Sequence, residues 1–340
     1  MGGCYGSACN YVPAPSAEEI RMGDIESLIS KFFKTRDKKH LIDAHNSFFQ
    51  YNTSGFFAVV AKKAKIDDVS DIPKEFPDIE YEVKFDIQAQ GKGKEPSVEQ
   101  YLDAFDFPAG RSARFLKDPV NHVATGVNHF LGDDLDEKLV IIEKGGKTYL
   151  KEKGPVISLA LGVPFEEIVI KRTEIRYQAN LTEILNKVHK VKSEQGASYR
   201  GAIRKEKGDA FLLDTNDGRI YSMTFTRAYL TKAGEDKESA VQRQLEIEYA
   251  GFIPGFQAHK KDCESQMVQG MVSIAKYIYS LYNGSPIAGG WTMDLNVTSE
   301  RKYDFINGKR PLEKKKQELL AAEVSSALIA ETPAKAYVKR

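Results

Sequence analysis

The sequence predicts an α+β protein built on a closed antiparallel β-barrel of about eight strands, with helices at both termini. Three observations predict it. From residue 79 onward, polar and apolar side chains alternate along many segments with the period of a β-strand. Turn signals such as Lys144-Gly-Gly-Lys147 and Asn216-Asp-Gly218 join neighbouring segments as hairpins. The stretches before and after this part have the spacing of amphipathic helices instead.

Residues 1–78 are expected to form a helical N-terminal extension. Ser16-Ala-Glu-Glu19 predicts a capping box that starts a helix ending near residue 33. Apolar residues recur along it at helical spacing, so it has one apolar face. A second helix is expected over about residues 38–51, and a linker with two prolines over residues 71–78.

The barrel is expected over residues 79–256. Its strands, in chain order, are expected at residues 80–88, 111–117, 138–144, 148–153, 167–177, 199–205, 210–214, 219–229 and 241–249. Helices are expected at residues 97–105 and 180–193. Lys207-Gly-Asp209 is interpreted as a turn, and residues 119–134 as an inserted loop.

Residues 257–340 are expected to form a helical C-terminal extension that packs on the barrel. The expected helices span residues 264–283 and about 311–331. In the second of these, Leu320, Val324 and Leu328 form an apolar stripe that could dock on the barrel.

Bulk properties limit the class of protein. With 49 basic and 48 acidic residues, any charge that binds a ligand must be local. Three cysteines, Cys4, Cys9 and Cys263, do not make a disulfide framework, which indicates a reducing compartment. The apolar runs are too short to span a bilayer, and no signal-peptide stretch follows Met1. A cytoplasmic protein with no membrane partner is expected.

The segment Glu80-Tyr-Glu-Val-Lys84 carries the first functional signal. Because side chains on a strand alternate between faces, Glu80, Glu82 and Lys84 share one face and the apolar residues share the other. Taken alone, this strand is most simply a charged solvent face over an apolar core.

The same alternation recurs on other expected strands, which changes the interpretation. Glu246 and Glu248 share a face of one strand, and Lys151 and Lys153 share a face of another. A third strand aligns three charged residues on one face, namely Arg172, Glu174 and Arg176. If these faces point inward, a dry barrel could not hold them, because buried unpaired charge is very costly. Carboxylates suit Mg²⁺ or Mn²⁺, and Lys and Arg suit phosphate oxygens.

Glu80-x-Glu82-x-Lys84 resembles the ExExK signature of the CYTH family, also called triphosphate tunnel metalloenzymes. Residues 146–155 resemble the family's Gly-x-x-x-Leu-Thr-x-Lys-Gly segment, which places Lys153 on the family lysine. Arg172-Thr-Glu174 resembles the start of its Arg-x-Glu-x-Glu strand, and Leu245-Glu-Ile-Glu248 resembles its closing strand. Asp214 lies where the family has an aspartate after a hairpin. The resemblance covers residues 79–251, about half of the chain.

The sequence also departs from the family pattern. Val140 and Ile142 stand where the family has Arg-x-Arg, while Lys138 and Lys144 share their strand parity. Arg176 replaces a carboxylate. The basic strand near residue 199 keeps Arg200 and Arg204 without a clean match to the family.

The resemblance implies metal-dependent hydrolysis of a triphosphate or polyphosphate inside the barrel. The implied catalytic residues are Glu80, Glu82, Lys84 and Glu174. The implied phosphate-binding residues are Lys84, Lys151, Lys153, Arg172, Arg200 and Arg204. The implied ligands of Mg²⁺ or Mn²⁺ are Glu80, Glu82, Glu246, Glu248 and Asp214.

Two other functions stay open at this point. One is an adenylate cyclase of the class IV type, which would use a ribose hydroxyl as the nucleophile. The other is a non-catalytic polyphosphate or nucleotide-binding module with a docking role. A small-molecule triphosphate or polyphosphate is the expected partner, and an RNA 5′-triphosphate end is the one nucleic-acid candidate. A homodimer is an open expectation.

Overall fold

The structure is a computed structural model that describes residues 17–50, 56–67, 71–105, 114–118, 122–132, 139–196, 198–231, 241–256 and 263–306. The expected helix near residues 311–331 and its docking on the barrel lie outside these residues. So do Cys4, Cys9 and Lys138.

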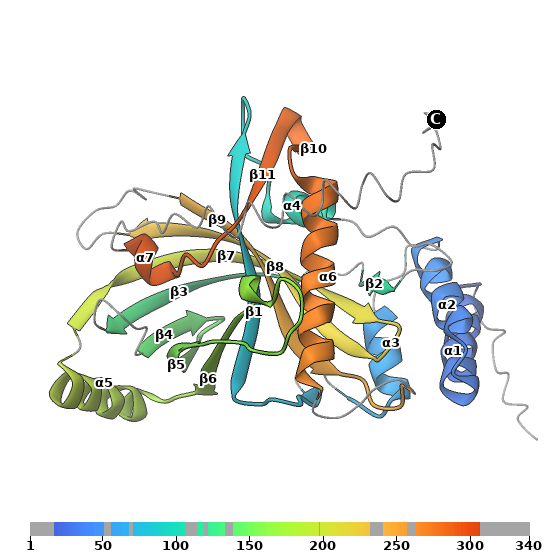
Figure 1. Cartoon of the computed structure of the whole chain (residues 1–340), viewed down its shortest axis with the longest axis horizontal. Coiled ribbons are helices and arrows are strands. Elements are labelled where there is room, and N and C mark those ends of the chain that lie inside the picture. The colour runs from blue at the N-terminus through green and yellow to red at the C-terminus, as the bar shows by residue number, and fades with distance from the viewer. Residues whose placement is uncertain are drawn as a thin grey trace, which may run out of the picture.

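Eight strands form a closed antiparallel barrel, as the sequence predicted (Figure 1). Around the ring they follow the order β1, β6, β5, β4, β3, β7, β8 and β9, and β9 pairs back with β1. Their bounds are β1 Ile79–Gln90, β3 His122–Gly132, β4 Leu139–Lys144, β5 Lys147–Ile157, β6 Ile170–Gln178, β7 Ser198–Asp214, β8 Arg219–Thr231 and β9 Val241–Phe252.

Three short strands extend this sheet outside the ring. β2 (Phe115–Lys117) pairs with β7, and β11 (Trp291–Val297) pairs with the second half of β1. β10 (Ser285–Ile287) pairs with β11. The chain after the long helix α6 (Glu264–Tyr282) therefore returns to the barrel as strand, which the sequence did not predict.

Seven α-helices surround the barrel within the described residues. α1 (Ala17–Thr35), α2 (Lys38–Gln50) and α3 (Phe56–Lys63) pack together against one end of β7 and β8, sharing a core with Leu213 and Ile220. α4 (Val98–Ala104) and α6 cover the outer face of the wall, and α5 (Leu181–Gln195) packs on β4 and β5. α7 (Lys302–Ile306) is a single short turn of helix. The helices α3 and α7 were not predicted.

The hydrophobic core lies between the outside of the barrel wall and α6. Tyr81, Val83 and Phe85 are almost fully buried and share this core with Met271 and Ile274 of α6. Since neighbouring side chains on a strand point to opposite faces, the alternate residues of β1 point into the barrel. The outward apolar layer that the sequence predicted for this strand is therefore confirmed.

β7 is one continuous strand of 17 residues, so the turn predicted at Lys207-Gly-Asp209 is wrong. Gly208 instead leaves room for a helix to pack against the strand. A Cβ at this position would lie 2.4 Å from Leu102 Cδ1 and 2.7 Å from Val98 Cγ1. The missing side chain thus lets α4 pack directly on the strand.

Other boundaries also differ from expectation. β3 lies within the segment that the sequence analysis interpreted as an inserted loop. The strand was missed because its apolar and polar residues alternate only weakly and Gly126 interrupts them. β6 begins at Ile170, after the 3₁₀ helix η2 (Glu166–Ile168), rather than at residue 167. A second 3₁₀ turn, η3 (Ala288–Gly290), precedes β11. Across the described ranges, no helix combines the length and apolar character needed to cross a membrane.

Candidate functional site

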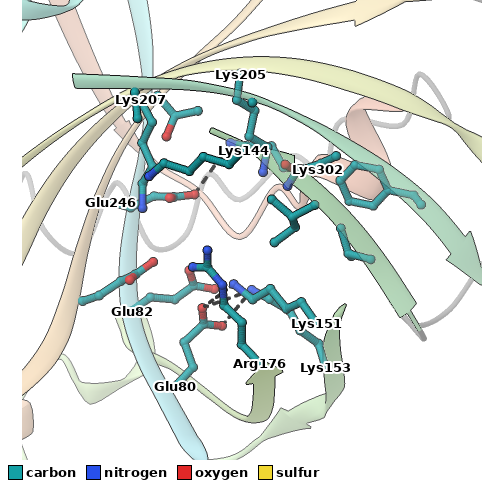
Figure 2. A pocket seen from close by; sticks show the side chains of 18 of the residues that line it. Glu80, Glu82, Lys144, Lys151, Lys153, Arg176, Lys205, Lys207, Glu246 and Lys302 are labelled. Atoms are coloured by element: carbon teal, nitrogen blue, oxygen red, sulfur yellow. Dashed lines mark hydrogen bonds and ion pairs between the residues drawn. The ribbon is translucent and has the colours of Figure 1, made fainter. Parts of the chain in front are cut away.

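The barrel encloses a cavity of about 130 Å³ whose wall is densely charged (Figure 2). Eight cationic side chains line it, from Lys84, Lys144, Lys151, Lys153, Arg176, Lys205, Lys207 and Lys302. Four carboxylates line it as well, from Glu80, Glu82, Glu246 and Glu248. Positive charge is therefore in excess, which favours an anionic ligand.

Three of the carboxylates meet at one place. Glu80 and Glu82 lie two residues apart on β1, and Glu248 lies opposite Glu82 on the neighbouring β9. One oxygen of each lies within 4.8 Å of the others. This set of hard oxygen donors fits Mg²⁺ or Mn²⁺, which prefer carboxylate ligands.

Glu248 shows the electrostatic repulsion between carboxylates that a bound cation would relieve at this cluster. Burial, together with the nearby carboxylates Glu80 and Glu246, raises its pKa to about 7 against the opposing charge of Lys207. Like charges held close in a poorly hydrated interior repel strongly.

Glu80 has the opposite environment, because three cations surround it. Burial alone would raise its pKa, but Lys153, Lys151 and Arg172 outweigh that effect and hold the pKa well below its usual range. Lys153 Nζ lies 2.9 Å from Glu80 Oε2. Arg172 donates to both β1 carboxylates, at 2.5 Å from Nε to Glu80 and 2.5 Å from an Nη to Glu82.

Glu174 lies next to this group on β6 and extends the network of ion pairs. Its carboxylate lies 2.7 Å from Lys151 Nζ and 3.1 Å from Lys153 Nζ. It thus holds the two lysines of β5 together rather than joining the cluster of three carboxylates.

Glu246 lies at a second carboxylate position, between two lysines. Its Oε1 lies 3.9 Å from Lys84 Nζ and 3.6 Å from Lys302 Nζ. Burial opposes ionisation, but these two lysines lower the pKa of Glu246. Lys84 also pairs with Glu82 at 3.1 Å, so it links the two acidic positions.

Arg200 and Arg204 do not line the cavity, contrary to expectation. Arg204 pairs with Glu206 at 2.9 Å and lies over the ring of Tyr229, and Arg200 donates to the Gly132 carbonyl at 3.1 Å. The side chains of β7 that point into the barrel are those of Lys205 and Lys207, and Arg204 has the opposite strand parity.

Lys205 and Lys207 occupy the inward positions of β7 instead, and the sequence analysis missed both. A turn assigned at Lys207-Gly-Asp209 removed Lys207 from any strand, and Lys205 was only the last residue of the strand expected at residues 199–205. Reading one long strand through Gly208 would have placed these lysines on the same face as Ile203, which lies inside the barrel.

Asp214 also lies away from the carboxylate cluster, at the C-terminal end of β7. Its side chain is fully buried, pairs with Arg114 at 2.8 Å and accepts from the Asn216 backbone N–H at 2.8 Å. Burial and the neighbouring Asp217 raise its pKa. The contacts stabilise the turn between β7 and β8, so Asp214 is not placed to share a cation with Glu80.

The wall formed by β4 is largely apolar. Val140 and Ile142, which replace the basic pair of the resembled family, line the cavity together with Phe130 of β3. Lys144 lines it too, as its strand parity suggested, and so does Arg176.

Comparisons with known proteins find only distant likeness. No protein-family profile matches the chain, and no curated protein matches it. Among solved structures, the chain is similar to a conserved hypothetical protein from Pyrococcus furiosus, with 13% identity, 57% of this chain and 89% of that chain covered, and a TM-score of 0.31. It is similar to the PH1819 protein from Pyrococcus horikoshii, with 13% identity, 67% and 99% covered, and a TM-score of 0.32.

The Pct1 RNA triphosphatase of S. pombe is a third similar structure, with 8% identity, 81% of this chain and 97% of that chain covered, and a TM-score of 0.27. Scores this low leave the fold to rest on the strand pairing described above.

Proposed function

We propose that the barrel interior binds a divalent cation, Mg²⁺ or Mn²⁺, together with a triphosphate or polyphosphate, and hydrolyses the phosphoanhydride bond. The observation that carries this proposal is a cluster of three carboxylates facing a wall of cations within one cavity. The resemblance to the CYTH family, which rests on the same residues of the sequence, implies the same chemistry.

The cation would be held by Glu80, Glu82 and Glu248, whose oxygens already lie together. Glu246, two residues before Glu248 on β9, is placed as a further ligand or as a partner of Lys84. When bound, such an ion polarises phosphoryl oxygens and lowers the pKa of a coordinated water.

The cationic residues would bind the phosphate chain and offset its negative charge in the transition state. Lys84, Lys151 and Lys153, which the sequence analysis also assigned to phosphate, line the cavity and belong to this group. Arg172 was assigned to it as well, but its guanidinium donates to Glu80 and Glu82. Lys144, Arg176, Lys205 and Lys207 extend it around the cavity. Arg suits bidentate contacts with phosphate oxygens, while the ammonium groups act as mobile point charges.

Substrate entry requires the ion pairs to exchange partners. Lys151 and Lys153 have flexible stems, and both lie against Glu80, one of the carboxylates that the cation would bind. Once the cation binds those carboxylates, the ammonium groups are available for phosphate and can swing to enlarge the cavity.

A non-catalytic phosphate-binding module is the second candidate. The apolar side chains of Val140 and Ile142 favour it, because they leave β4 without the basic pair of the resembled family. A binder needs the cations for affinity but needs no group to activate water.

A phosphate-release assay separates these functions. The substrates are tripolyphosphate, thiamine triphosphate, ATP and triphosphate-ended RNA, each with Mg²⁺, with Mn²⁺ and with excess chelator. We expect metal-dependent release from at least one substrate. Conversion of ATP to a cyclic product would favour the cyclase, and tight binding without release would favour the binder. Release that is indifferent to chelator would contradict the metal assignment.

A further inference from the structure

Residues 298–306, here called the strap, cover one end of the barrel interior. The strap leaves β1 where the backbone N–H of Thr298 donates to the Lys84 carbonyl at 3.0 Å. It ends in α7, which lies at one end of the barrel in Figure 1. There Phe305 packs against Phe130, Val140 and Ile203 on the inner side of the wall. The strap therefore spans the opening from β1 to the opposite strands.

Polar side chains inside the barrel fasten the strap in place. Gln242 and Gln244 of β9 are almost completely buried and point inward. The side chain of Gln242 donates to the Glu300 carboxylate, and that of Gln244 donates to the Glu300 carbonyl at 3.1 Å. Buried amides with specific partners hold a segment in one register, so the position of the strap is well defined.

This position directs Lys302 into the cavity, which it lines together with Lys144 and Lys205 (Figure 2). Its side chain is 7% exposed. Its ammonium donates to the Gln244 side-chain oxygen and lies 3.6 Å from Glu246.

Cations outnumber carboxylates in the cavity lining around Lys302, eight to four. Glu246 lies between Lys302 and Lys84, and Lys84 pairs with Glu82 as well. Lys205 and Lys207 line the same cavity. Placing like charges together in a buried site costs free energy unless an anion joins them. The surplus of positive charge beside Lys302 therefore favours a bound anion.

The part of the cavity wall next to Lys302 is apolar, so a cation supplied by a segment outside the barrel strands would add positive charge there. Val140 and Ile142 offer no charge where they line the cavity, and Lys144 at the end of β4 supplies a cation further along the strand. Phe305 of the strap packs on Val140, and Lys302 lies three residues before Phe305 in the sequence. The strap therefore brings Lys302 towards this apolar wall.

We propose that Lys302 is a phosphate-binding residue of the tunnel, supplied by the strap beside the apolar part of β4 formed by Val140 and Ile142. The assignment rests on the proposed function, since it names a further contact to the same polyphosphate. It brings a residue far outside the eight barrel strands into the site.

The test is calorimetric titration of the full-length protein with tripolyphosphate in the presence of Mg²⁺. Lys302→Met removes the charge and keeps the length of the side chain. Loss of one charge-assisted contact predicts binding about ten- to a hundredfold weaker. Lys190→Met is the matched control, because Lys190 lies on the surface of α5 with its side chain 61% exposed. It makes the same change in net charge and should leave the affinity unchanged.

Lys302→Gln is the second variant, in case the methionine disturbs the strap, because its amide keeps a donor towards Gln244. Thermal melting identifies which variants are folded. Binding by either folded variant as tight as that of the wild type would overturn the role of Lys302 and leave the proposed function standing. A wild type that binds no tripolyphosphate would instead overturn the proposed function, and the role of Lys302 with it.

Discussion

Lys153 Nζ lies 2.9 Å from Glu80 Oε2, so the lysine of β5 contacts the carboxylate that the proposed function assigns to a metal ion. Arg172 Nε reaches the same oxygen at 2.5 Å. The cationic residues that would bind the substrate and the carboxylates that would bind the metal are thus paired with each other inside the barrel. Glu80, Lys153 and Arg172 are thus partnered before the ligands arrive, and the ligands would exchange those partners.

Glu80→Gln and Glu82→Gln should each abolish metal-dependent phosphate release, with losses of about a hundredfold or more, larger than the ~10–100-fold typical of groups that only support a metal ligand. The change is nearly isosteric but removes the negative charge that holds a hard cation. Glu194→Gln, on the surface of α5 with a side chain 59% exposed, is the control. Full activity in the Glu82 variant would remove that residue from the metal site.

Glu248→Gln should stabilise the metal-free protein at pH 8, because it removes one of three mutually repelling carboxylates. The pKa of Glu248 is raised to about 7 in the folded protein, so its contribution to stability is lost as pH rises from its ordinary pKa through 7. The melting temperature of the variant should therefore exceed that of the wild type only above this range.

The same variant should respond less to metal. Mg²⁺ should raise the melting temperature of the wild type by ligand linkage and raise that of Glu248→Gln much less. Chelator-treated samples at pH 5 and pH 8 provide the comparison. Equal metal-induced shifts in both proteins would show that Glu248 is not a ligand.

Lys205→Met and Lys207→Met should each weaken tripolyphosphate binding by about tenfold, as expected for loss of one charge-assisted contact. Arg204→Met is a control on the same strand, since Arg204 points to the other face and pairs with Glu206. Titration calorimetry measures all three. A larger effect at Arg204 than at Lys205 would contradict the strand parity of β7.

Arg172→Met should destabilise the metal-free protein by about 3–5 kcal/mol, because it leaves Glu80 and Glu82 without their shared partner. The guanidinium side chain is only 3% exposed, so water cannot replace it easily. Mg²⁺ should recover part of the loss, because the cation neutralises the same carboxylates. Denaturant unfolding with and without Mg²⁺ measures both effects.

Gly208→Ala should destabilise the protein by about 1–3 kcal/mol, the usual effect of forcing extra volume into a packed contact. The added Cβ would meet Leu102 Cδ1 at 2.4 Å. Gly23→Ala is the control, because a Cβ there meets nothing within 4 Å. A neutral Gly208 variant would indicate that α4 does not pack on β7 at this point.

Much of the barrel could be predicted because alternation is a local property of a strand. It placed Glu80 and Glu82 on one face of their strand, and Glu246 and Glu248 on one face of theirs, from their neighbours alone. The inward direction of these faces was inferred from the recurrence of the pattern and the family resemblance. Where alternation is weak, as in β3, or where a glycine imitates a turn, as at Gly208, local pattern was misleading. The second error hid Lys207 and left Lys205 at the end of an expected strand.

Lys302 could not be predicted in this way. It lies beyond the eight strands in the sequence, and only the hydrogen bonds of Gln242 and Gln244 to the strap bring it to the cavity. Asp214 shows the reverse case, because its place after a hairpin matched the family while its partner Arg114 holds it elsewhere. Contacts between distant parts of the chain decide both positions.

The pairing of β1 with β9 has a consequence for how the protein folds. These strands begin and end the barrel, so their pairing closes the ring only after the longest loop of chain has been ordered. Glu82 and Glu248 are direct partners in this pairing and repel each other until a cation joins them. A divalent ion at this seam would act as a clasp, and its greatest kinetic effect should be to slow reopening of the ring.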